Sequence, residues 1–418
     1  DPDKRAAAGT DLPGPAASSR LSQHRAGPVP KVKIGGIYQA PWMLGLVGSI
    51  TQEYRPCQVL DLRKTQGRQQ LYIHFIDCDK RLDQWIDEDT IHSLPGSKPN
   101  TPKKCRRPST GLRKTEANNA NGSVVGENDC DLLEKQHEIA TRIRNVESIQ
   151  FGQYDIKTWY YSPFPGEYGQ CQNLYICEYC LKYMRQATSL FNHECRLRSP
   201  PGTVIYRDAS RIAVYEVDGR RHKLYCQNLC LLSKLFMDHK TLYYDVQSFL
   251  FYIVVVIDEQ GTHIAGYFSK EKCSPQDHNL ACIMVLPQYQ KQGLGKFLVA
   301  LSYELTRREG RTGTPEKPLS DLGRVTYRSF WLWMILQQLQ TDHDLSIDQL
   351  SERTCFKRED IICTLRGVDM VAFHDGDHAV VYDQSIVESR LKLLHHSFSN
   401  LRFRPSHLDW RPRKRPKK

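Results

Sequence analysis

The chain has 418 residues, of which 40% are hydrophobic and 25% charged, and its formal net charge is +11. That length is enough for several domains of roughly 150 residues each. The longest apolar run, residues 249–257, is far shorter than the roughly 20 residues of a membrane helix, and the chain opens with no charged-then-apolar leader. We therefore expect neither a membrane protein nor a secreted one.

The N-terminal part consists of three stretches that differ in composition and hydrophobic pattern. Residues 1–30 are rich in Ala, Pro, Gly and Ser, so we expect them to be disordered. Short alternating runs from 31 to 95, such as residues 69–76, predict a small all-β barrel. Residues 96–140 have the composition of a basic flexible linker, and an amphipathic stretch at 132–143 leads into the largest folded region.

Positive charge is concentrated in two stretches. Residues 97–114 carry seven cations and no acid, and residues 411–418 carry six cations in eight positions. Blocks of like charge repel themselves, stay extended and bind polyanions, so both stretches favour nucleic-acid contact or nuclear import. Solvated segments that only keep the protein soluble are the alternative.

Within the large region, residues 249–257 and 262–268 predict an antiparallel hairpin. A further strand over 281–286 ends at Pro287 and leads into a loop that holds two glycines. Apolar residues at helical spacing then predict a helix over 296–308.

After this helix, Ser320 is a candidate N-cap for a second helix that runs toward Leu339. Two short helices and two strands are predicted next, at 347–354, 358–365, 370–373 and 379–382. That order is typical of a winged-helix shape, which in an enzyme is more often a packing module than a DNA reader. The predicted fold class is mixed α/β (α+β).

A group of Cys and His residues forms the clearest metal motif. Two residues separate Cys177 from Cys180, and such a turn binds one side of a tetrahedral zinc ion. His193 and Cys195 would complete the site. Only one residue separates this pair, so it needs a helix end or a loop, and Cys171 remains an alternative ligand. Four protein ligands leave no open position, so this zinc would be structural.

A second motif, residues 290–296 (QKQGLGK), lies directly between the predicted strand and the predicted helix. Glycines let a backbone approach a ligand closely, and a helix N-terminus receives phosphate. Lys291 and Lys296 add positive charge. The pattern matches neither of the common ATP and dinucleotide motifs, so a plain glycine turn remains the alternative.

Several motifs together resemble the MYST family of histone acetyltransferases over roughly residues 141–413. Residues 281–296 look like the acetyl-CoA loop of this family, and residues 315–323 (PEKPLSDLG) look like its catalytic segment. Further matching stretches lie at 159–165, 225–232, 238–244, 251–252 and 266–272. Residues 31–95 are similar to a chromo-barrel (Tudor-knot) domain, and this combination resembles the MOF (males-absent-on-the-first) branch.

The resemblance implies an acetyl-CoA-dependent N-acetyltransferase fold. It places a C2HC zinc finger at about 171–198, the core at about 200–340 and a helix-turn-helix-like, winged-helix part at about 341–400. The family's finger has three residues between His and Cys, whereas this chain has one. By matching position, the following residues would bind acetyl-CoA: Ile283, Met284, Val285, Lys291, Gln292, Gly293, Leu294, Gly295, Lys296, Ser320 and Ser329.

Three further residues carry the expected chemistry. A lysine ammonium with a pKa near 10.4 must lose a proton before it attacks a thioester, and Glu316 matches the family's catalytic general base. Without the resemblance, a Glu between two prolines is a solvated loop residue. Cys282 is either an acyl acceptor or a small strand residue. Lys240 matches the lysine that this family autoacetylates.

The expected protein is a nuclear histone lysine acetyltransferase that uses acetyl-CoA on histone tails, histone H4 above all. Its expected partners are nucleosomes, the subunits of a chromatin-modifying complex, and RNA or DNA through the barrel and basic segments. Four barrel aromatics, Tyr38, Tyr72, Phe75 and Trp85, could instead form a methyl-lysine cage. The rival functions are a catalytically weak chromatin- or RNA-binding subunit and an acetyltransferase for small amines.

Overall fold

The computed structural model describes residues 32–43, 52–93 and 141–413, with gaps at 66, 77, 79, 142, 210, 375 and 399–402. The predicted disordered segment, linker, amphipathic stretch and basic tail lie wholly or mostly outside the described residues. The chain divides into two compact units, Asp1–Ala117 and Asn118–Lys418, and each is described by itself. Among the described helices, none is both long enough and apolar enough to cross a membrane.

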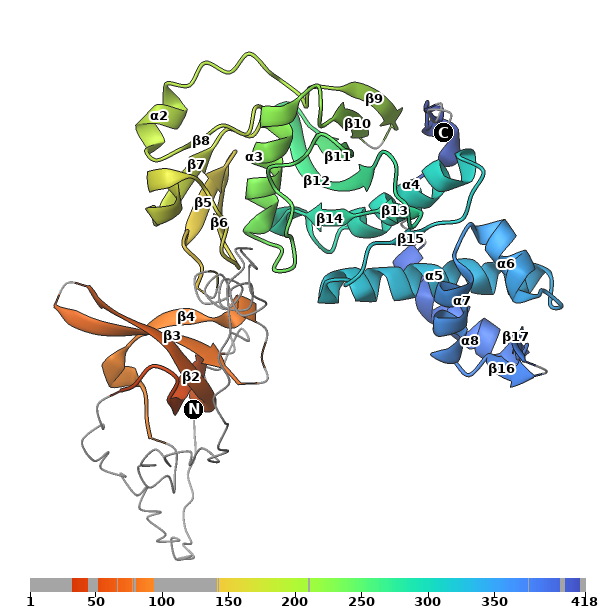
Figure 1. Cartoon of the computed structure of the whole chain (residues 1–418), viewed down its shortest axis with the longest axis horizontal. Coiled ribbons are helices and arrows are strands. Elements are labelled where there is room, and N and C mark those ends of the chain that lie inside the picture. The colour runs from red at the N-terminus through yellow and green to blue at the C-terminus, as the bar shows by residue number, and fades with distance from the viewer. Residues whose placement is uncertain are drawn as a thin grey trace, which may run out of the picture. The chain divides into compact units, whose positions relative to one another are not determined.

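The folded part of the first unit is a four-stranded antiparallel sheet in the order β1-β2-β3-β4 (Figure 1). Its strands are β1 Ile37–Met43, β2 Gln52–Thr65, β3 Arg68–Phe75 and β4 Gln84–Asp87, with short 3-10 turns at Lys80–Leu82 and Glu88–Thr90. Gln39 and His92 exchange two backbone hydrogen bonds of 2.8 Å, so the chain after β4 returns to β1. This return covers an exposed sheet edge, and the predicted all-β fold is confirmed.

A five-stranded antiparallel sheet in the order β14-β12-β11-β10-β9 forms the centre of the second unit. Its strands are β9 Thr203–Arg207, β10 Ile212–Asp218, β11 Phe249–Ile257, β12 Thr262–Glu271 and β14 Cys282–Val285. The predicted hairpin of β11 and β12 is present. Beside this sheet, β13 His278–Leu280 pairs in parallel with β15 Thr314–Pro315.

Strand β11 consists of nine consecutive apolar residues. Successive side chains alternate between the two faces of a strand, and both faces of this sheet are covered. Leu250, Tyr252 and Val254 pack with helix α4 Leu294–Arg308, whereas Phe251 and Ile253 pack with helix α3 Lys223–Lys234. The sheet is therefore the wall between two hydrophobic cores.

A smaller sheet in the order β6-β5-β7-β8 precedes the central sheet in the chain (Figure 1). It consists of β5 Ser148–Phe151, β6 Tyr154–Lys157, β7 Asn173–Ile176 and β8 Tyr183–Met184, with a 3-10 turn at Gly166–Gln170 and helix α2 Ala187–Phe191. Ile149, Phe151 and Leu174 share the α3-side core. The small sheet is thus docked on the central one.

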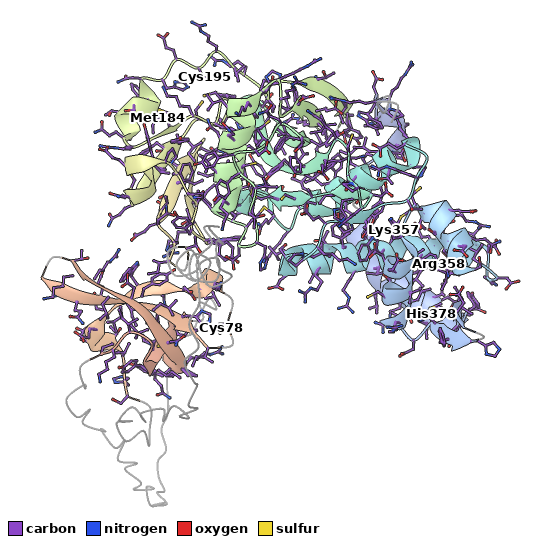
Figure 2. The ribbon with its side chains drawn as sticks, in the orientation of Figure 1. Cys78, Met184, Cys195, Lys357, Arg358 and His378 are labelled. Atoms are coloured by element: carbon purple, nitrogen blue, oxygen red, sulfur yellow. The ribbon has the colours of Figure 1, made fainter. Side chains whose placement is uncertain are left out.

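The C-terminal part is helical with a two-stranded wing. Its elements are α5 Asp321–Thr341, α6 Ile347–Thr354, α7 Arg358–Arg366, β16 Val371–His374, β17 Asp377–Val380, α8 Gln384–Phe398 and a 3-10 turn at Pro405–His407. The Arg358 guanidinium pairs with Asp348 and Asp377, and Arg366 contacts His378 of the wing (Figure 2). Both arginines therefore pair with residues of the same module.

The predicted C-terminal elements are all present with shifts of one or two residues. Helix α4 begins at Leu294 rather than at the predicted residue 296, because Gly293 takes a left-handed conformation with φ of 84° and serves as the N-cap. Ser320 is the N-cap of α5, and its hydroxyl accepts a hydrogen bond of 3.1 Å from the Gly323 amide.

Candidate functional site

A cleft of about 1060 Å³ opens beside β14 and the first turns of α4 and α5. Every predicted acetyl-CoA-binding residue lines it except Ser329. The Ser329 hydroxyl instead donates to the Thr326 carbonyl of its own helix at 2.9 Å. The cleft is also lined by residues that were not among the predicted acetyl-CoA-binding residues: Trp159, Phe236, Met237, Tyr289, Gln290, Leu322, Val325, Thr326 and Arg404.

The floor of the cleft is built by the loop between β14 and α4. Lys291 and Gly293 both have left-handed backbones, with φ of 61° and 84°. A Cβ atom at Gly293 would meet nothing within 4 Å, so glycine is needed there for the backbone conformation and not for space. At Gly295, by contrast, a Cβ would make an ordinary contact of 3.7 Å with Thr326 of α5.

Two helix N-termini meet at this cleft. The first turn of α4 has glycine as its N-cap, so no side chain occupies its amides, and the first turn of α5 lines the same space. The first amides of a helix lack intrahelical acceptors and carry the positive end of the helix dipole. Converging N-termini therefore favour a ligand with several phosphate oxygens. Val325, 70% exposed, adds an apolar side chain at the rim.

Strand β14 forms one wall and lies at the edge of the central sheet. Among the described strands it pairs with β12 alone, through Cys282 to Val285, so its other edge faces the cleft without a strand partner there. The Gln290 amide donates to the Val285 carbonyl at 3.0 Å and ties the loop to the end of the strand. An open strand edge suits an extended ligand that carries amides of its own.

The residues expected to perform chemistry lie next to the cleft rather than among its lining residues. Glu316 is exposed, and its backbone amide donates to the Leu280 carbonyl at 2.8 Å, two residues before Cys282. The Lys240 ammonium lies 3.6 Å from the Cys282 sulfur. Lys240 is buried, and the contact joins residues that are 42 positions apart in the chain. The fold thus gathers the three predicted residues around the start of β14.

The predicted zinc ligands are also brought together. The ligand atoms of Cys177, Cys180, His193 and Cys195 all lie within 4.8 Å of one another. Helix α2 ends at Phe191, so His193 and Cys195 lie in the irregular segment beyond it, and Figure 2 labels Cys195 there. A helix end is what the one-residue spacing required.

The chemistry of this group suits zinc. A hydrogen bond from the Cys180 thiol lowers the pKa of Cys177 to about 5, which favours the thiolate that zinc binds. The Cys180 sulfur is 3.2 Å from the His193 ring nitrogen Nε2. Cys171 is not part of the group, and its thiol donates to the Glu167 carbonyl at 3.3 Å. Three thiols and one imidazole, with no further ligand position, fit a structural zinc.

The proposed aromatic cage of the barrel is wrong in its membership. Tyr72 and Phe75 are each 2% exposed and belong to the interior. The Arg63 guanidinium lies 4.1 Å above the Trp85 ring and occupies one face of it. The sequence could not show that Tyr72 is buried. Leu71, Tyr72 and Ile73 of β3 are all buried, so burial along this strand does not follow the alternation expected of a strand.

Comparison with known families agrees with these features. The MOZ/SAS family model matches residues 199–408, and the zinc finger model of the MYST family matches residues 143–196. Residues 45–93 match the Tudor-knot model, described as an RNA-binding knot of a chromodomain.

Individual proteins are similar over long stretches. The "Histone acetyltransferase of the MYST family 1" of Arabidopsis thaliana is 40% identical over 90% of this chain and 84% of its own length. The "Histone acetyltransferase Tip60 homolog" of Caenorhabditis elegans is 37% identical over 88% of this chain and 89% of its own length. "Histone acetyltransferase MOF" of Drosophila melanogaster is 48% identical over 67% of this chain and 34% of its own length.

The fold, the cleft and these matches define an acetyltransferase that uses acetyl-CoA as its acetyl donor. The chain belongs to the MYST family of histone acetyltransferases.

Proposed function

We propose that this chain is a nuclear, MOF-type enzyme that acetylates lysines of histone tails in chromatin, with histone H4 as its preferred substrate. Among the three relatives described above, Drosophila MOF has the highest identity, and the Tudor-knot match supplies the barrel of that type. The observation that carries the catalytic part is the cleft itself. Two helix N-termini and an open strand edge converge there, and the Glu316 amide is hydrogen bonded to Leu280, two residues before β14.

In the proposed mechanism, residues 290–296 and Ser320 hold the phosphates of acetyl-CoA through backbone amides and positive charge. Ile283, Met284 and Val285 hold the chain that leads to the thioester. Glu316 takes the proton of the incoming lysine, because an ammonium group has no lone pair for attack. The neutral amine then attacks the carbonyl carbon, and the CoA sulfur leaves and takes up the second amine proton as the thiol. The first proton passes from Glu316 to solvent.

Cys282 and Lys240 offer a second route within the same proposal. The Cys282 sulfur lies 3.6 Å from the Lys240 ammonium, beside the start of β14, and could accept the acetyl group first. The same contact supports Lys240 as the autoacetylated residue. A Cys282→Ala variant distinguishes the two routes. If an acyl-cysteine is required, this variant should lose as much acetyl-transfer activity as the Glu316→Gln variant, and if it is not, the loss should be smaller.

The division of the chain is also part of the proposal. A barrel over 31–95, a linker over 96–140 and an acetyltransferase domain over 141–413 would separate target recruitment from catalysis. The barrel and the basic stretches would bind RNA or DNA, and the whole chain would work with the subunits of a chromatin-modifying complex.

Glu316→Gln tests the base. The variant keeps the shape of the side chain, and we expect transfer to a histone H4 peptide at neutral pH to fall by ~10²-fold. A higher pH should restore part of the rate, because it supplies free amine. Radiolabelled acetyl-CoA would be supplied with nucleosomes, H4 peptide or a polyamine in parallel. A wild-type rate at pH 7 contradicts the base, and preference for the polyamine contradicts the histone substrate.

A further inference from the structure

The segment that carries Glu316 is too short to hold its own position. Strand β15 has only two residues, Thr314 and Pro315, and pairs with β13 through His278 and Leu280. Glu316 follows at the exposed end of this strand. A base must lie within hydrogen-bond reach of its proton, so something outside the strand has to fix it.

The helical pair α6 and α7 contacts this segment on both sides of Glu316. Before it, the Gly313 amide donates to the Cys355 carbonyl at 3.0 Å, and Gly313 forms an isolated parallel bridge with Phe356. After it, the Lys317 ammonium lies 3.4 Å from Oδ1 of Asp360 in the first turn of α7. The C-terminal module therefore contacts the chain both before and after Glu316, at Gly313 and at Lys317.

Asp360 is an unusual residue for a packing helix. It is 3% exposed, whereas the side chain of its partner Lys317 is 63% exposed. Burial raises the pKa of Asp360, and the Thr314 hydroxyl and the Lys317 ammonium partly offset that rise. That hydroxyl is close to the carboxyl group, although neither it nor Oδ2 of Asp360 completes a hydrogen bond of good geometry. A buried carboxylate with so few partners is costly unless its cation stays in place.

The other groups that face this carboxyl group do not replace Lys317. Tyr327 of α5 and Tyr303 of α4 interact with it as neutral phenols, and burial raises the pKa of both well above the usual range. Glu359 of its own helix has the same sign of charge and raises the pKa of Asp360 further. The cation that pairs with Asp360 thus comes from the residue next to Glu316.

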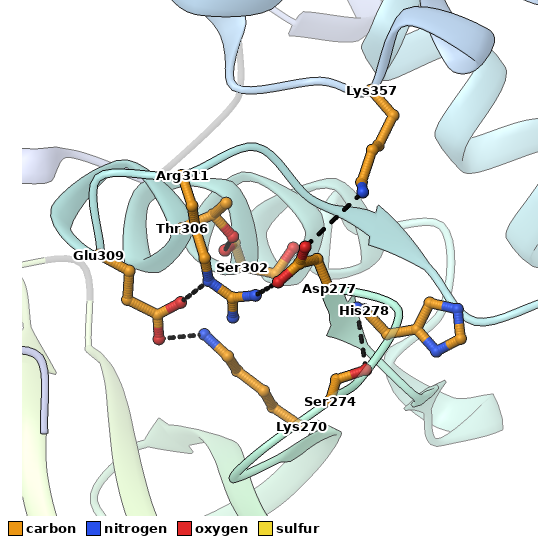
Figure 3. Close-up of polar contacts among 9 residues, drawn as sticks. All are labelled: Lys270, Ser274, Asp277, His278, Ser302, Thr306, Glu309, Arg311 and Lys357. Atoms are coloured by element: carbon orange, nitrogen blue, oxygen red, sulfur yellow. Dashed lines mark hydrogen bonds and ion pairs between the residues drawn. The ribbon is translucent and has the colours of Figure 1, made fainter. Parts of the chain in front are cut away.

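A chain of charges also connects the start of α7 to residues next to β13 and β15 (Figure 3). Lys357, the N-cap of α7, lies 3.8 Å from Asp277, and Asp277 lies 3.0 Å from Arg311. Arg311 then pairs with Glu309, and Glu309 pairs with the buried Lys270 of β12. The signs alternate along the chain. It links α7 to β13, to the end of α4 and to the central sheet.

We propose that Asp360 is a positioning residue for acetyl transfer: by holding Lys317, it fixes the segment that presents Glu316 to the substrate amine. The proposal rests on Glu316 as the general base. It assigns the C-terminal module a role in catalysis that a packing module alone does not have. Asp360 touches neither substrate nor cofactor, and it acts through the backbone between Lys317 and Glu316.

Asp360→Asn and Lys317→Gln test this role in the full chain. Each variant should lower kcat by about tenfold and leave the KM for acetyl-CoA unchanged within about twofold, because misplacement of a base affects the chemical step. The rate should recover partly as pH rises, as in Glu316→Gln. Lys317→Arg keeps the pair and should keep kcat. Removal of Lys317 leaves the buried carboxyl group of Asp360 without its cation, so a denaturation curve of each variant is recorded to separate a loss of fold from a loss of kcat.

The decisive measurement is the combination with Glu316→Gln. If Asp360 acts through the base, the double variant is no slower than Glu316→Gln alone. Full additivity of the two losses would overturn the positioning role and leave the base intact. A wild-type rate in Glu316→Gln alone would overturn both. Asp342→Asn is the matched control, because Asp342 pairs with Arg353 of α6 at 2.8 Å, away from this segment, and its kcat should not change.

Discussion

The zinc finger and the cleft are two binding sites built on opposite principles. In the finger, four side chains supply every ligand atom, and the local backbone is a two-residue strand and a five-residue helix. In the cleft, backbone amides at two helix N-termini and an open strand edge supply the polar groups. A side-chain site needs particular residues, whereas a backbone site needs particular conformations. Substitutions should therefore damage the two sites in different ways.

The largest effect should follow loss of a metal ligand. Cys177→Ala should release zinc and unfold the finger, because metal binding contributes roughly 10 kcal/mol or more to the folding of such small modules. Metal analysis should give about one zinc per wild-type chain and almost none for the variant. Hydrogen exchange should show loss of protection in β7 and β8.

Cys171→Ala is the control for the finger, since its thiol bonds to Glu167 outside the cluster. It should keep full zinc content. Retention of zinc in Cys195→Ala together with its release in Cys171→Ala would show that the cluster seen in the structure is not the binding set.

At Gly295, a negatively charged side chain should weaken acetyl-CoA binding far more than a small neutral one. Gly295→Glu places a carboxylate at the N-terminus of α4, where it repels phosphates at a few Å, and acetyl-CoA affinity should fall by about 100-fold. Gly295→Ala should bind normally, because its Cβ would only touch Thr326 at 3.7 Å. Calorimetry measures both. Equal affinities for the two variants would mean that the phosphates do not lie at this helix end.

A substitution at Gly293 tests the effect of backbone conformation in the same loop, without a new side-chain contact. Alanine there meets no atom within 4 Å but must adopt a φ near 84°. That strain is about 1–2 kcal/mol, so Gly293→Ala should weaken acetyl-CoA binding by about tenfold. Isothermal calorimetry compares the acetyl-CoA affinity of this variant with that of Gly295→Ala. The difference measures the effect of the left-handed backbone at Gly293.

A smaller effect should distinguish the two serine N-caps of the helical part, Ser320 of α5 and Ser346 of α6. Ser320→Ala and Ser346→Ala each remove a side-chain cap, and each should lower the free energy of unfolding by about 1 kcal/mol. Only Ser320 lines the cleft, so only its variant should also bind acetyl-CoA more weakly. Denaturant titration and calorimetry on the same samples compare the two. A binding loss in both variants would point to general destabilisation.

The smallest effect should be a dependence on acid. The C-terminal segment that brings Arg404 to the cleft is held by Arg413, which bonds to Asp218 at 2.9 Å, and Lys272 bonds to the same carboxylate. Burial alone would raise the pKa of Asp218, but the hydrogen bonds from Lys272 and Arg413 lower it well below its usual value. The folded pKa lies below the unfolded one, so this stability is complete above about pH 4 and is lost as pH falls further.

Denaturant unfolding between pH 5 and 2 measures this contribution. Asp218→Asn should lose the stability at all pH values and show a flatter acid profile than the wild type. An identical slope in both proteins would show that other carboxylates account for the acid sensitivity.

The sequence predicted elements best where one local signal sufficed. Ser320 identified the start of α5, the apolar run identified β11, and the cysteine spacing identified half of the metal cluster. It gave no indication of α3, whose buried face includes Cys226, Asn228 and Cys230 and does not have a clear apolar stripe. The start of α4 was missed by two residues because a left-handed glycine, and not a capping side chain, sets it.

The contacts that complete the site were beyond the reach of local patterns. Lys240 meets Cys282 across 42 positions, and Lys317 meets Asp360 across 43. Arg404 reaches the cleft from a segment that follows α8. Each pairing is set by the packing of helices on the sheet, and no spacing in the chain encodes it. The family resemblance located Glu316, but only the three-dimensional contacts indicate what holds it.

The two helix ends at the cleft have a consequence for turnover. They would hold phosphates, and these groups are the same in acetyl-CoA and in the CoA that remains after transfer. An interaction of equal strength with both favours neither direction of the reaction and does not lower the barrier. It would instead keep CoA bound after the transfer, so the release of CoA would limit the rate of turnover. Added salt would weaken the binding of the phosphates and speed up this release.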